Sequence, residues 1–272
     1  MYILSNCVHN TCKIEFIMLI WLKRGASMLK YIPYIFNKTD IENNFENRKQ
    51  LDNWLLRKAN SEKIIKVRNG LYVSLDQTGS INVSKFEIAS KISNDSFICY
   101  HSALEYYGLA NQVFRTIIVG STSRINSFEF DNIEYLCKLT RNTEFIDYIK
   151  YAGVRVTTLE RTIIDCIDDI NLAGGIDELL NALSQIKFID EKRLLDVLKS
   201  YDKVLLYQKV GYILEQFNSN LMLSDEFFDE CQMHLTNQVK YFLKDEFIDI
   251  VYCPRWKLMA PKNLKSRIYG GI

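Results

Sequence analysis

Proline and glycine are scarce in this chain of 272 residues, which contains three prolines and 11 glycines. Low-complexity linkers and fibrous proteins are rich in one or both, and no biased segment or solenoid-like repeat is visible. Hydrophobic residues make up 48% of the chain, which is long enough for one large domain or for a small domain and a larger one. The composition therefore predicts a globular protein.

Long apolar runs are also missing. The run FIMLIWL, at residues 16–22, is far shorter than the ~20 residues that cross a bilayer, and its basic residues follow it where those of a signal peptide would precede it. We expect no membrane partner. We predict that Met28 is the native start and that residues 1–27 are an upstream-translated extension; a real N-terminal helix is the alternative.

Paired cysteines and nucleotide-binding glycine motifs are missing as well. The seven cysteines are odd in number and form no C-x-x-C pair, which is typical of reduced thiols in the cytoplasm. Cys231 and His234 are fewer than the three or four ligands that zinc needs. The chain has no G-x-x-x-x-G-K-[ST], G-x-G-x-x-G or G-x-S-x-G motif. The sequence predicts no catalytic residue, no metal site and no cofactor.

Charge is balanced over the whole chain but unevenly distributed. The formal net charge is +1, whereas the segment from Arg48 to Arg68 has seven basic and two acidic residues, a local net charge of +5. Such a segment favours contact with phosphate groups, although a merely solvated surface is the alternative. The basic residues are Arg48, Lys49, Arg57, Lys58, Lys63, Lys66 and Arg68.

The basic segment has the pattern of two helices. Thr39 to Glu42 fits a capping box, which predicts the start of a short helix. A second helix is predicted from about Glu46 to Asn60, with Leu51, Trp54 and Leu55 at the spacing of one buried stripe. The residues that this leaves for solvent are Arg48, Lys49, Asn53, Arg57 and Lys58.

A hairpin follows the second helix. The runs Lys63 to Val67 and Leu71 to Ser74 are strand-like, and Asn69-Gly70 between them favours a type I′ turn. A short helix, a basic helix and a hairpin in this order indicate a winged helix-turn-helix. In that fold the basic helix enters the DNA major groove and the hairpin, or wing, lies against phosphates.

The remaining two thirds of the chain predicts a larger α+β domain. Strands are expected at residues 96–100, 115–121 and 153–158 and on either side of Asp131-Asn132, with capping boxes opening helices at Ser84, Ser102 and Thr157. After Gly174-Gly175 four apolar stripes of helical period follow, at residues 176–186, 190–201, 203–217 and 224–235. The predicted fold class is α+β, with a winged helix-turn-helix at 28–76 and a mixed α/β domain ending in several helices at 77–272.

Two groups of residues invite a catalytic interpretation. His101, Ser102 and Glu105 are the residue types of a hydrolase triad, but they are too close in sequence to align, and a cap explains Ser102 and Glu105. A set of acidic residues between positions 160 and 169 could hold Mg²⁺ in a nuclease. Arg161, however, is four residues before Asp165, the spacing of an ion pair on a helix. The set comprises Glu160, Asp165, Asp168 and Asp169.

Several segments taken together resemble the AbiEi-type antitoxins of bacterial abortive-infection systems. They are KVRNGLYV, CYHSALEYYGL (99–109), VRVTTLERTIIDCID (154–168), AGGIDELLNAL (173–183), LYQKVGYILE (206–215) and WKLMAPKNL (256–264). The resemblance spans about Thr39 to Leu264, and TTLERTIIDCID is its most specific part.

The resemblance implies a bacterial autorepressor and antitoxin of a type IV toxin-antitoxin system that acts in phage defence. Its partners would be operator DNA, as inverted repeats upstream of its own operon, and a nucleotidyltransferase toxin with which it forms no stable complex. Two protomers are expected on the DNA.

Side-chain roles in DNA binding are assigned from spacing. We expect Arg48, Lys49 and Asn53 to approach base edges, and Arg57, Lys58, Lys63, Lys66 and Arg68 to contact phosphates. Two other classes remain open: an antitoxin that contacts its toxin directly through the C-terminal helices, and a metal-dependent nuclease that uses Asp165.

Overall fold

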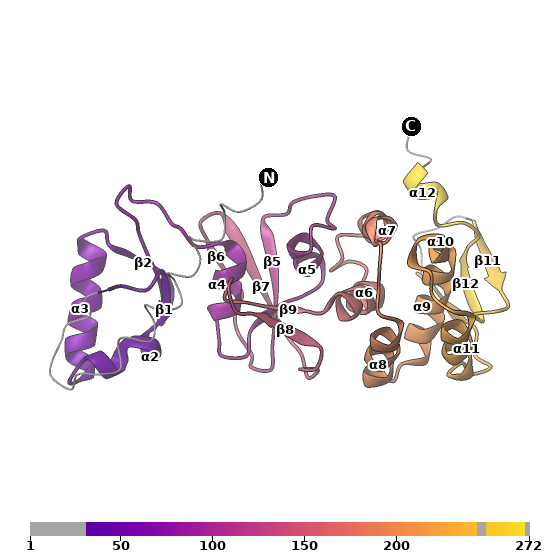
Figure 1. The fold of residues 1–272 in the computed structure, drawn as a ribbon, viewed down its shortest axis with the longest axis horizontal. Coiled ribbons are helices and arrows are strands. Elements are labelled where there is room, and N and C mark those ends of the chain that lie inside the picture. Colours follow the sequence, from indigo (N-terminus) through magenta and orange to yellow (C-terminus); the bar gives the residue numbers. More distant parts are fainter. Residues whose placement is uncertain (1–30, 244–248, 270–272) are drawn as a thin grey trace, which may run out of the picture. The chain divides into compact units, whose positions relative to one another are not determined.

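The computed structural model describes residues 31–243 and 249–269. The predictions for residues 1–27 and for a start at Met28 lie outside the described residues. Contacts within the chain divide it into two compact units, one that ends at Asn82 and one that begins at Val83 (Figure 1). The two units combine helices with several sheets, so the α+β class is confirmed. None of the helices in the described ranges is long and apolar enough to cross a membrane.

The first unit packs one long helix on a small antiparallel sheet. The strand order is β1-β3-β2, and α3 lies beside β2 (Figure 1). Its core gathers side chains from the three strands and from α2 and α3, namely Phe36, Ile41, Leu51, Trp54, Leu55, Ile64 and Tyr72. The elements are β1 (Ile35–Asn37), α2 (Lys38–Ile41), the 3-10 helix η2 (Glu42–Asn44), α3 (Arg48–Asn60), β2 (Ile64–Arg68) and β3 (Leu71–Ser74).

The start of the short helix differs from the prediction. The capping residue of α2 is Asn37, whose backbone N–H donates to Asp40 Oδ2 at 2.9 Å, in place of the predicted box from Thr39 to Glu42. The chain leaves β1 in extended conformation at Asn37, and this backbone geometry is what a capping residue needs.

The first unit runs beyond the predicted boundary at residue 76. Leu75 and Ile81 form an isolated bridge, and the Asp76 carboxylate accepts hydrogen bonds from the backbone N–H groups of Thr78 and Ser80. The Thr78 hydroxyl also donates to this carboxylate. These hydrogen bonds, of which the one from the hydroxyl contributes most, lower the pKa of Asp76 to about 2. Residues 75–82 therefore form an ordered loop of the first unit.

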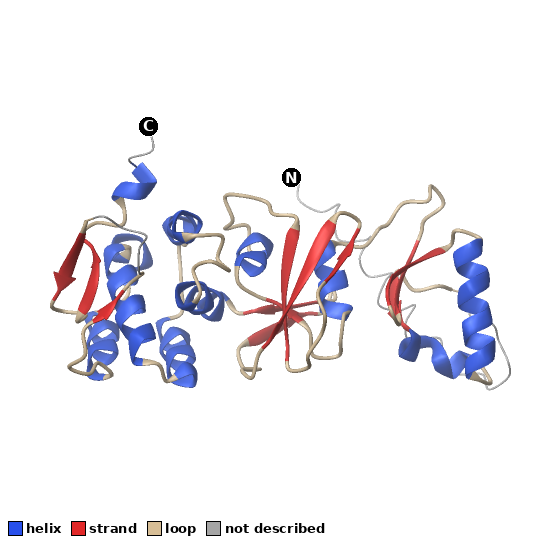
Figure 2. Ribbon diagram, turned by 180° about the vertical axis from the view of Figure 1, so that it is seen from behind, coloured by secondary structure: helices blue, strands red, loops and turns tan. Residues whose placement is uncertain are grey.

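The second unit contains a six-stranded mixed sheet with strand order β6-β7-β5-β4-β9-β8, and its strands fan out with the usual twist in Figure 2. Asp131 and Asn132 both have positive φ and join the antiparallel strands β6 and β7, as the type I′ geometry requires. The bounds are β4 (Phe97–Ile98), β5 (Thr116–Ser121), β6 (Phe128–Phe130), β7 (Ile133–Leu139), β8 (Ile146–Ile149) and β9 (Val154–Thr157).

Helices make up most of the remainder of this unit. The four apolar stripes predicted after Gly174-Gly175 are the helices α7, α8, α9 and α11, whose buried sides meet in one large core. The bounds are α4 (Lys85–Lys91), α5 (His101–Tyr106), α6 (Leu159–Asp168), α7 (Ile176–Gln185), α8 (Glu191–Tyr201), α9 (Val204–Gln216), α10 (Asn218–Leu221), α11 (Asp225–Met233) and α12 (Ser266–Tyr269).

Of the three capping boxes predicted for the second unit, one is confirmed and two are wrong. Ser84 and Glu87 cap α4 reciprocally. Ser102 instead lies inside α5, where its buried hydroxyl accepts a hydrogen bond from Ile118 N at 2.8 Å, because the chain enters that helix through Tyr100 with φ of 53°. Thr158, not Thr157, caps α6.

A second small sheet, which the sequence did not predict, packs on α9. Its strands are β10 (Lys240–Tyr241), β11 (Ile250–Cys253) and β12 (Leu258–Pro261), in the order β10-β12-β11. Trp256 is completely buried between β11 and β12, and its indole N–H donates to Glu215 on α9 at 2.6 Å. Gly211 makes room for the ring, because a Cβ atom there would overlap it.

We predict that Gly211→Ala destabilises the second unit. Alanine normally stabilises a helix by about 1 kcal/mol relative to glycine. A loss of stability in this variant would therefore be due to the clash with Trp256. Overpacking should cost about 1–3 kcal/mol, measured as a lower denaturant midpoint. Leu205→Ala, at a partly exposed position of the same helix, is the control. An unchanged or raised midpoint for Gly211→Ala would contradict the packing described here.

Candidate nucleic-acid interface

Helix α3 has one apolar and one polar face. Asn47 caps it by accepting a hydrogen bond from Gln50 N at 3.0 Å. Leu51, Trp54 and Leu55 are buried, as their spacing predicts, and Trp54 contacts the rings of Phe36 and Phe45. This packing fixes the rotation of the helix. The residues on its other side are Arg48, Lys49, Asp52, Asn53, Leu56, Arg57 and Asn60, all of them exposed.

Lys58 does not belong to that polar face. It stands four residues after Trp54 and three after Leu55, on the buried side. Its side chain is half-buried and its ammonium group lies over the Trp54 ring, 5.6 Å from the centroid. The expectation that Lys58 faces solvent beside Arg57 is therefore wrong.

The exposed carboxylate on the polar face is already paired. Asp52 accepts a hydrogen bond from Lys38 Nζ of α2 at 2.7 Å. This bond lowers the pKa of Asp52, and nearby Arg48 lowers it further. The pairing leaves the cations Arg48, Lys49 and Arg57 to set the sign of the potential along this face.

The hairpin adds cations from the edge strand of the sheet. Lys66 pairs with Tyr72, and Tyr72 with Phe36, so their side chains share one sheet face. Phe36 and Tyr72 stack there with centroids 5.7 Å apart, and Phe36 contacts Trp54 of α3. Lys66 therefore projects on the α3 side. It is exposed, and so is Lys63 just before the strand.

The tip of the hairpin differs in detail from the prediction. Asn69-Gly70 forms the predicted two-residue turn, but only Gly70 has positive φ, +86°, as in a type II turn. A β-bulge between Lys66 and Arg68 adds local twist to the hairpin, so a type I′ turn is not needed to match the twist of the strands. Arg68, expected at a charged tip, is half-buried. Gly70 O accepts a hydrogen bond from Lys38 N at 2.9 Å, which ties the tip to α2.

These residues make a polar, cationic surface on one side of the first unit. The predicted residues Arg48, Lys49, Asn53, Arg57, Lys63 and Lys66 are exposed, whereas Lys58 and Arg68 are half-buried. Sequence reasoning missed Leu56, which is 61% exposed in the middle of the polar face. Its position three residues after Asn53 was the available signal. The surface offers donors and cations for binding, but no nucleophile with an adjacent base.

The acidic set of α6 is dispersed among separate partners. Glu160 accepts a hydrogen bond from Asp190 N, and Asp168 pairs with Lys203 at 2.5 Å. Asp165 is buried and pairs with Arg161 at 3.3 Å. Across residues 31–243 and 249–269, no three His, Cys, Asp or Glu side chains are grouped so that they could hold a metal ion.

Arg161 and Asp165 belong to a buried network. The Arg161 guanidinium donates to the carbonyl oxygens of Asn142 and Glu144 and lies over Phe97, 5.0 Å from the centroid, while the Tyr201 hydroxyl donates to Asp165. Burial raises the pKa of Asp165 to about 6, although Arg161 and Tyr201 oppose the shift. The network joins α6, α8 and the segment before β8.

Other chemically suggestive side chains also have structural partners. His101 Nε2 lies 3.2 Å from Glu178 Oε1, which also accepts hydrogen bonds from the backbone N–H groups of Asn111 and Gln112. Glu105 pairs with Lys85. His234 stacks on Tyr207 with centroids 4.2 Å apart, and Cys231, three residues before it, is buried. His101, Ser102 and Glu105 thus point to three different partners.

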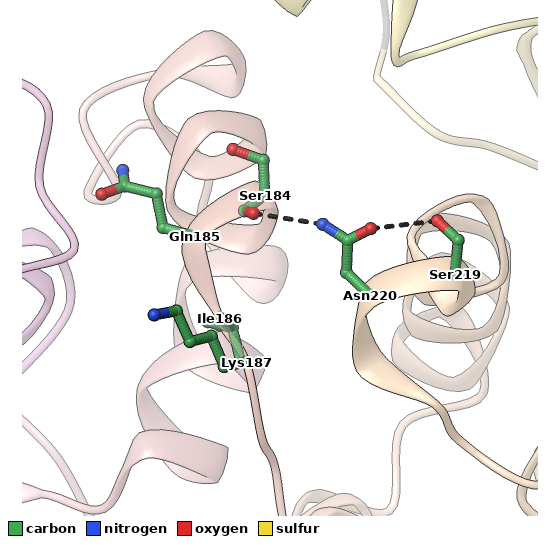
Figure 3. Close-up of a pocket in the computed structure, with 6 residues that line it drawn as sticks. All are labelled: Ser184, Gln185, Ile186, Lys187, Ser219 and Asn220. Carbon is green, nitrogen blue, oxygen red and sulfur yellow. Dashed lines mark hydrogen bonds between the residues drawn. The ribbon is translucent and has the colours of Figure 1, made fainter.

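The second unit has an open hollow of about 560 Å³ beside the end of α7. Figure 3 shows its six lining residues and the hydrogen bond from Asn220 to Ser184 O, 3.2 Å long, that crosses it. Lys187 is the one charged residue among the six, which include no carboxylate, thiol or imidazole. We assign no chemistry to this hollow.

Comparison with known proteins gives a structural likeness. No family model matches the sequence, and no curated protein matches it. The fold is similar to that of the RV2827C protein from Mycobacterium tuberculosis, known from a crystal structure. The TM-score is 0.60 at 12% sequence identity, over 88% of this chain and 89% of that one. At this identity the likeness shows the fold alone.

We predict that Arg161→Met strongly destabilises the second unit. The substitution leaves the Asp165 carboxylate buried without its cation, a change that typically costs about 3–5 kcal/mol. Urea unfolding at neutral pH measures it. Arg193→Met, at an exposed position of α8, is the matched control and should stay within about 0.5 kcal/mol of wild type. Equal effects of the two substitutions would contradict the network.

Asp165 also predicts a pH dependence. Its pKa is about 6 in the folded chain against an ordinary value of 3.8, so its contribution to stability is complete below the lower value and is lost as pH rises through the higher one. Asp165→Asn should remove this pH-dependent contribution to stability. The free energy of unfolding should then fall less between about pH 4 and about pH 7 than in wild type. Parallel pH curves for Asp165→Asn and wild type would contradict this, and Asp196→Asn, at an exposed site on α8, is the control.

Proposed function

We propose that this chain is a DNA-binding transcriptional repressor whose first unit is a winged helix-turn-helix. The observation that carries the proposal is the polar face of α3, where Arg48, Lys49 and Arg57 surround Asn53 and the carboxylate of Asp52 is already neutralised by Lys38. A helix with such a face suits the major groove, whose base edges accept hydrogen bonds and whose walls are phosphates.

The order of the elements supports the winged-helix interpretation. Strand β1, the short helices α2 and η2, the longer helix α3 and the hairpin β2–β3 follow one another, and β1 pairs with β3. A winged helix-turn-helix has this order after its first helix, with α3 as the recognition helix and the β2–β3 hairpin as the wing.

Exposure refines the proposed roles of the side chains. Arg48, Lys49 and Asn53 approach base edges, where arginine suits guanine and asparagine suits adenine. Arg57, Lys63 and Lys66 contact phosphates from the end of the helix and the edge of the hairpin. Lys58 and Arg68, also assigned to phosphates from sequence, are half-buried and would contribute less.

The biological role rests on the resemblance described above. In this proposal the protein acts in the cytoplasm of a bacterium as autorepressor and antitoxin of a type IV toxin-antitoxin system. Its DNA partner is the inverted repeats upstream of its own operon, bound by two protomers. The functional partner is a nucleotidyltransferase toxin, opposed without a stable complex. The second unit would carry the antitoxin activity.

The proposal predicts selective and salt-dependent DNA binding. Fluorescence anisotropy with labelled DNA from upstream of the gene, against shuffled DNA of equal length, should show preference for the upstream DNA. Arg48, Lys49, Arg57, Lys63 and Lys66 are the exposed cations of the surface. Three of them, Arg57, Lys63 and Lys66, are assigned to phosphates, so log affinity should fall with log salt at a slope of about −3 per protomer.

Substitutions locate the binding surface. Arg57→Ala and Lys66→Ala should weaken binding to all sequences and each reduce the slope by about 1, whereas Asn53→Ala should mainly reduce the preference for upstream DNA. Lys192→Ala removes the same charge from an exposed site on α8 and should change nothing. Binding that is flat in salt, or equal losses in Lys192→Ala, would refute the interface. Co-elution of the chain with its toxin would then favour direct contact, and DNA cleavage abolished by Asp165→Ala would favour a nuclease.

A further inference from the structure

We propose that Leu56 is a specificity-determining residue that reads the methyl group of a thymine. This inference rests on the proposed DNA-binding function. Leu56 is 61% exposed on α3, with Asn53 one turn earlier, Lys49 two turns earlier and Asn60 one turn later on the same side. A lone exposed leucine is ordinary on a protein surface. This one lies at the middle of the polar face, where a base-reading side chain would be.

Helix geometry sets which base pair Leu56 can meet. Asn53 and Leu56 are three residues apart, which is about 4.5 Å along the helix axis. Neighbouring base pairs are about 3.4 Å apart along the duplex. When Asn53 pairs with an adenine edge, Leu56 therefore lies over the same or the next base pair. The two side chains read a short A·T-containing step.

The chemistry of the groove gives Leu56 one suitable partner. Of the four bases, only thymine presents an apolar group, its C5 methyl, in the major groove, and apolar side chains contact it there. The other bases lack this methyl and present mainly hydrogen-bonding groups there, which a leucine would desolvate without compensation. Arg48, Lys49 and Arg57 around Leu56 favour the phosphate-lined groove over an apolar protein surface.

Removal of the methyl groups tests the inference directly. Upstream DNA amplified with dUTP in place of dTTP keeps its hydrogen bonds but lacks every thymine methyl. Wild-type protein should bind it about threefold to tenfold more weakly than the dTTP product, which is the effect of one or two buried methyl groups. Leu56→Ala should bind the dTTP product more weakly than wild type does, by a similar factor. Its affinity should fall little further on the dUTP product.

Two further variants control the comparison. Leu56→Met keeps an apolar side chain of similar size and should retain the discrimination between the two DNA products. Leu139→Ala truncates a leucine that is 64% exposed on β7 of the second unit, and it should discriminate as wild type does. Leu56→Ala and Leu56→Met should both keep the wild-type melting temperature, because the side chain is exposed.

The outcomes separate this inference from the proposed function. One outcome is that wild type prefers upstream DNA yet binds the dUTP and dTTP products equally; another is that Leu56→Ala loses as much affinity on the dUTP product as wild type does. In either case Leu56 does not read a methyl group, and the repressor proposal stands. If wild type shows no preference for upstream DNA, both proposals fail. A loss in wild type that Leu56→Ala abolishes and Leu56→Met preserves establishes the contact.

Discussion

The burial of Trp54 is the constraint on which the first unit depends. Its ring lies against Phe36 of the sheet and Phe45 of the connection, and Lys58 covers it from the same helix. A large aromatic ring in this position holds α3 at one rotation about its axis. The exposure of the polar face, including Asn53 and Leu56, follows from that rotation.

The second unit depends on a polar constraint instead. Arg161 is almost completely buried, yet its donors are shared among a carboxylate and two backbone carbonyl groups. Buried charges are tolerated only when paired and hydrogen-bonded in this way. Because those partners come from α6 and from the chain before β8, the side chain fixes how the helices begin to cover the sheet. The segment TTLERTIIDCID carries both charged members of the pair.

Periodic and local signals in the sequence predicted the fold best. The stripe at Leu51, Trp54 and Leu55 gave α3, and Ser84 with Glu87 gave the start of α4, because such signals depend on residues three or four apart. The small sheet of β10, β11 and β12 was missed because Lys240 pairs with Leu258 across a long stretch of chain. Strand β8 was missed because it is short, with no regular alternation of apolar and polar residues.

The candidate site was predicted in outline and missed in detail for related reasons. Charge and helical period identified Arg48, Lys49, Asn53 and Arg57. The half-burial of Lys58 was implicit in its spacing from Trp54 and could have been deduced. The half-burial of Arg68 could not be deduced, because it follows from a β-bulge and from the hydrogen bond between the hairpin and α2.

The hydrogen bond from Lys38 N to Gly70 O has a consequence for the kinetics and energetics of recognition. It joins the tip of the hairpin to the start of α2, and the ion pair of Lys38 with Asp52 joins α2 to α3. The hairpin and the helix are thus preorganised as one surface, so little conformational entropy remains to be lost when a ligand docks on both. A free-standing loop at the same place would have to be ordered at every encounter.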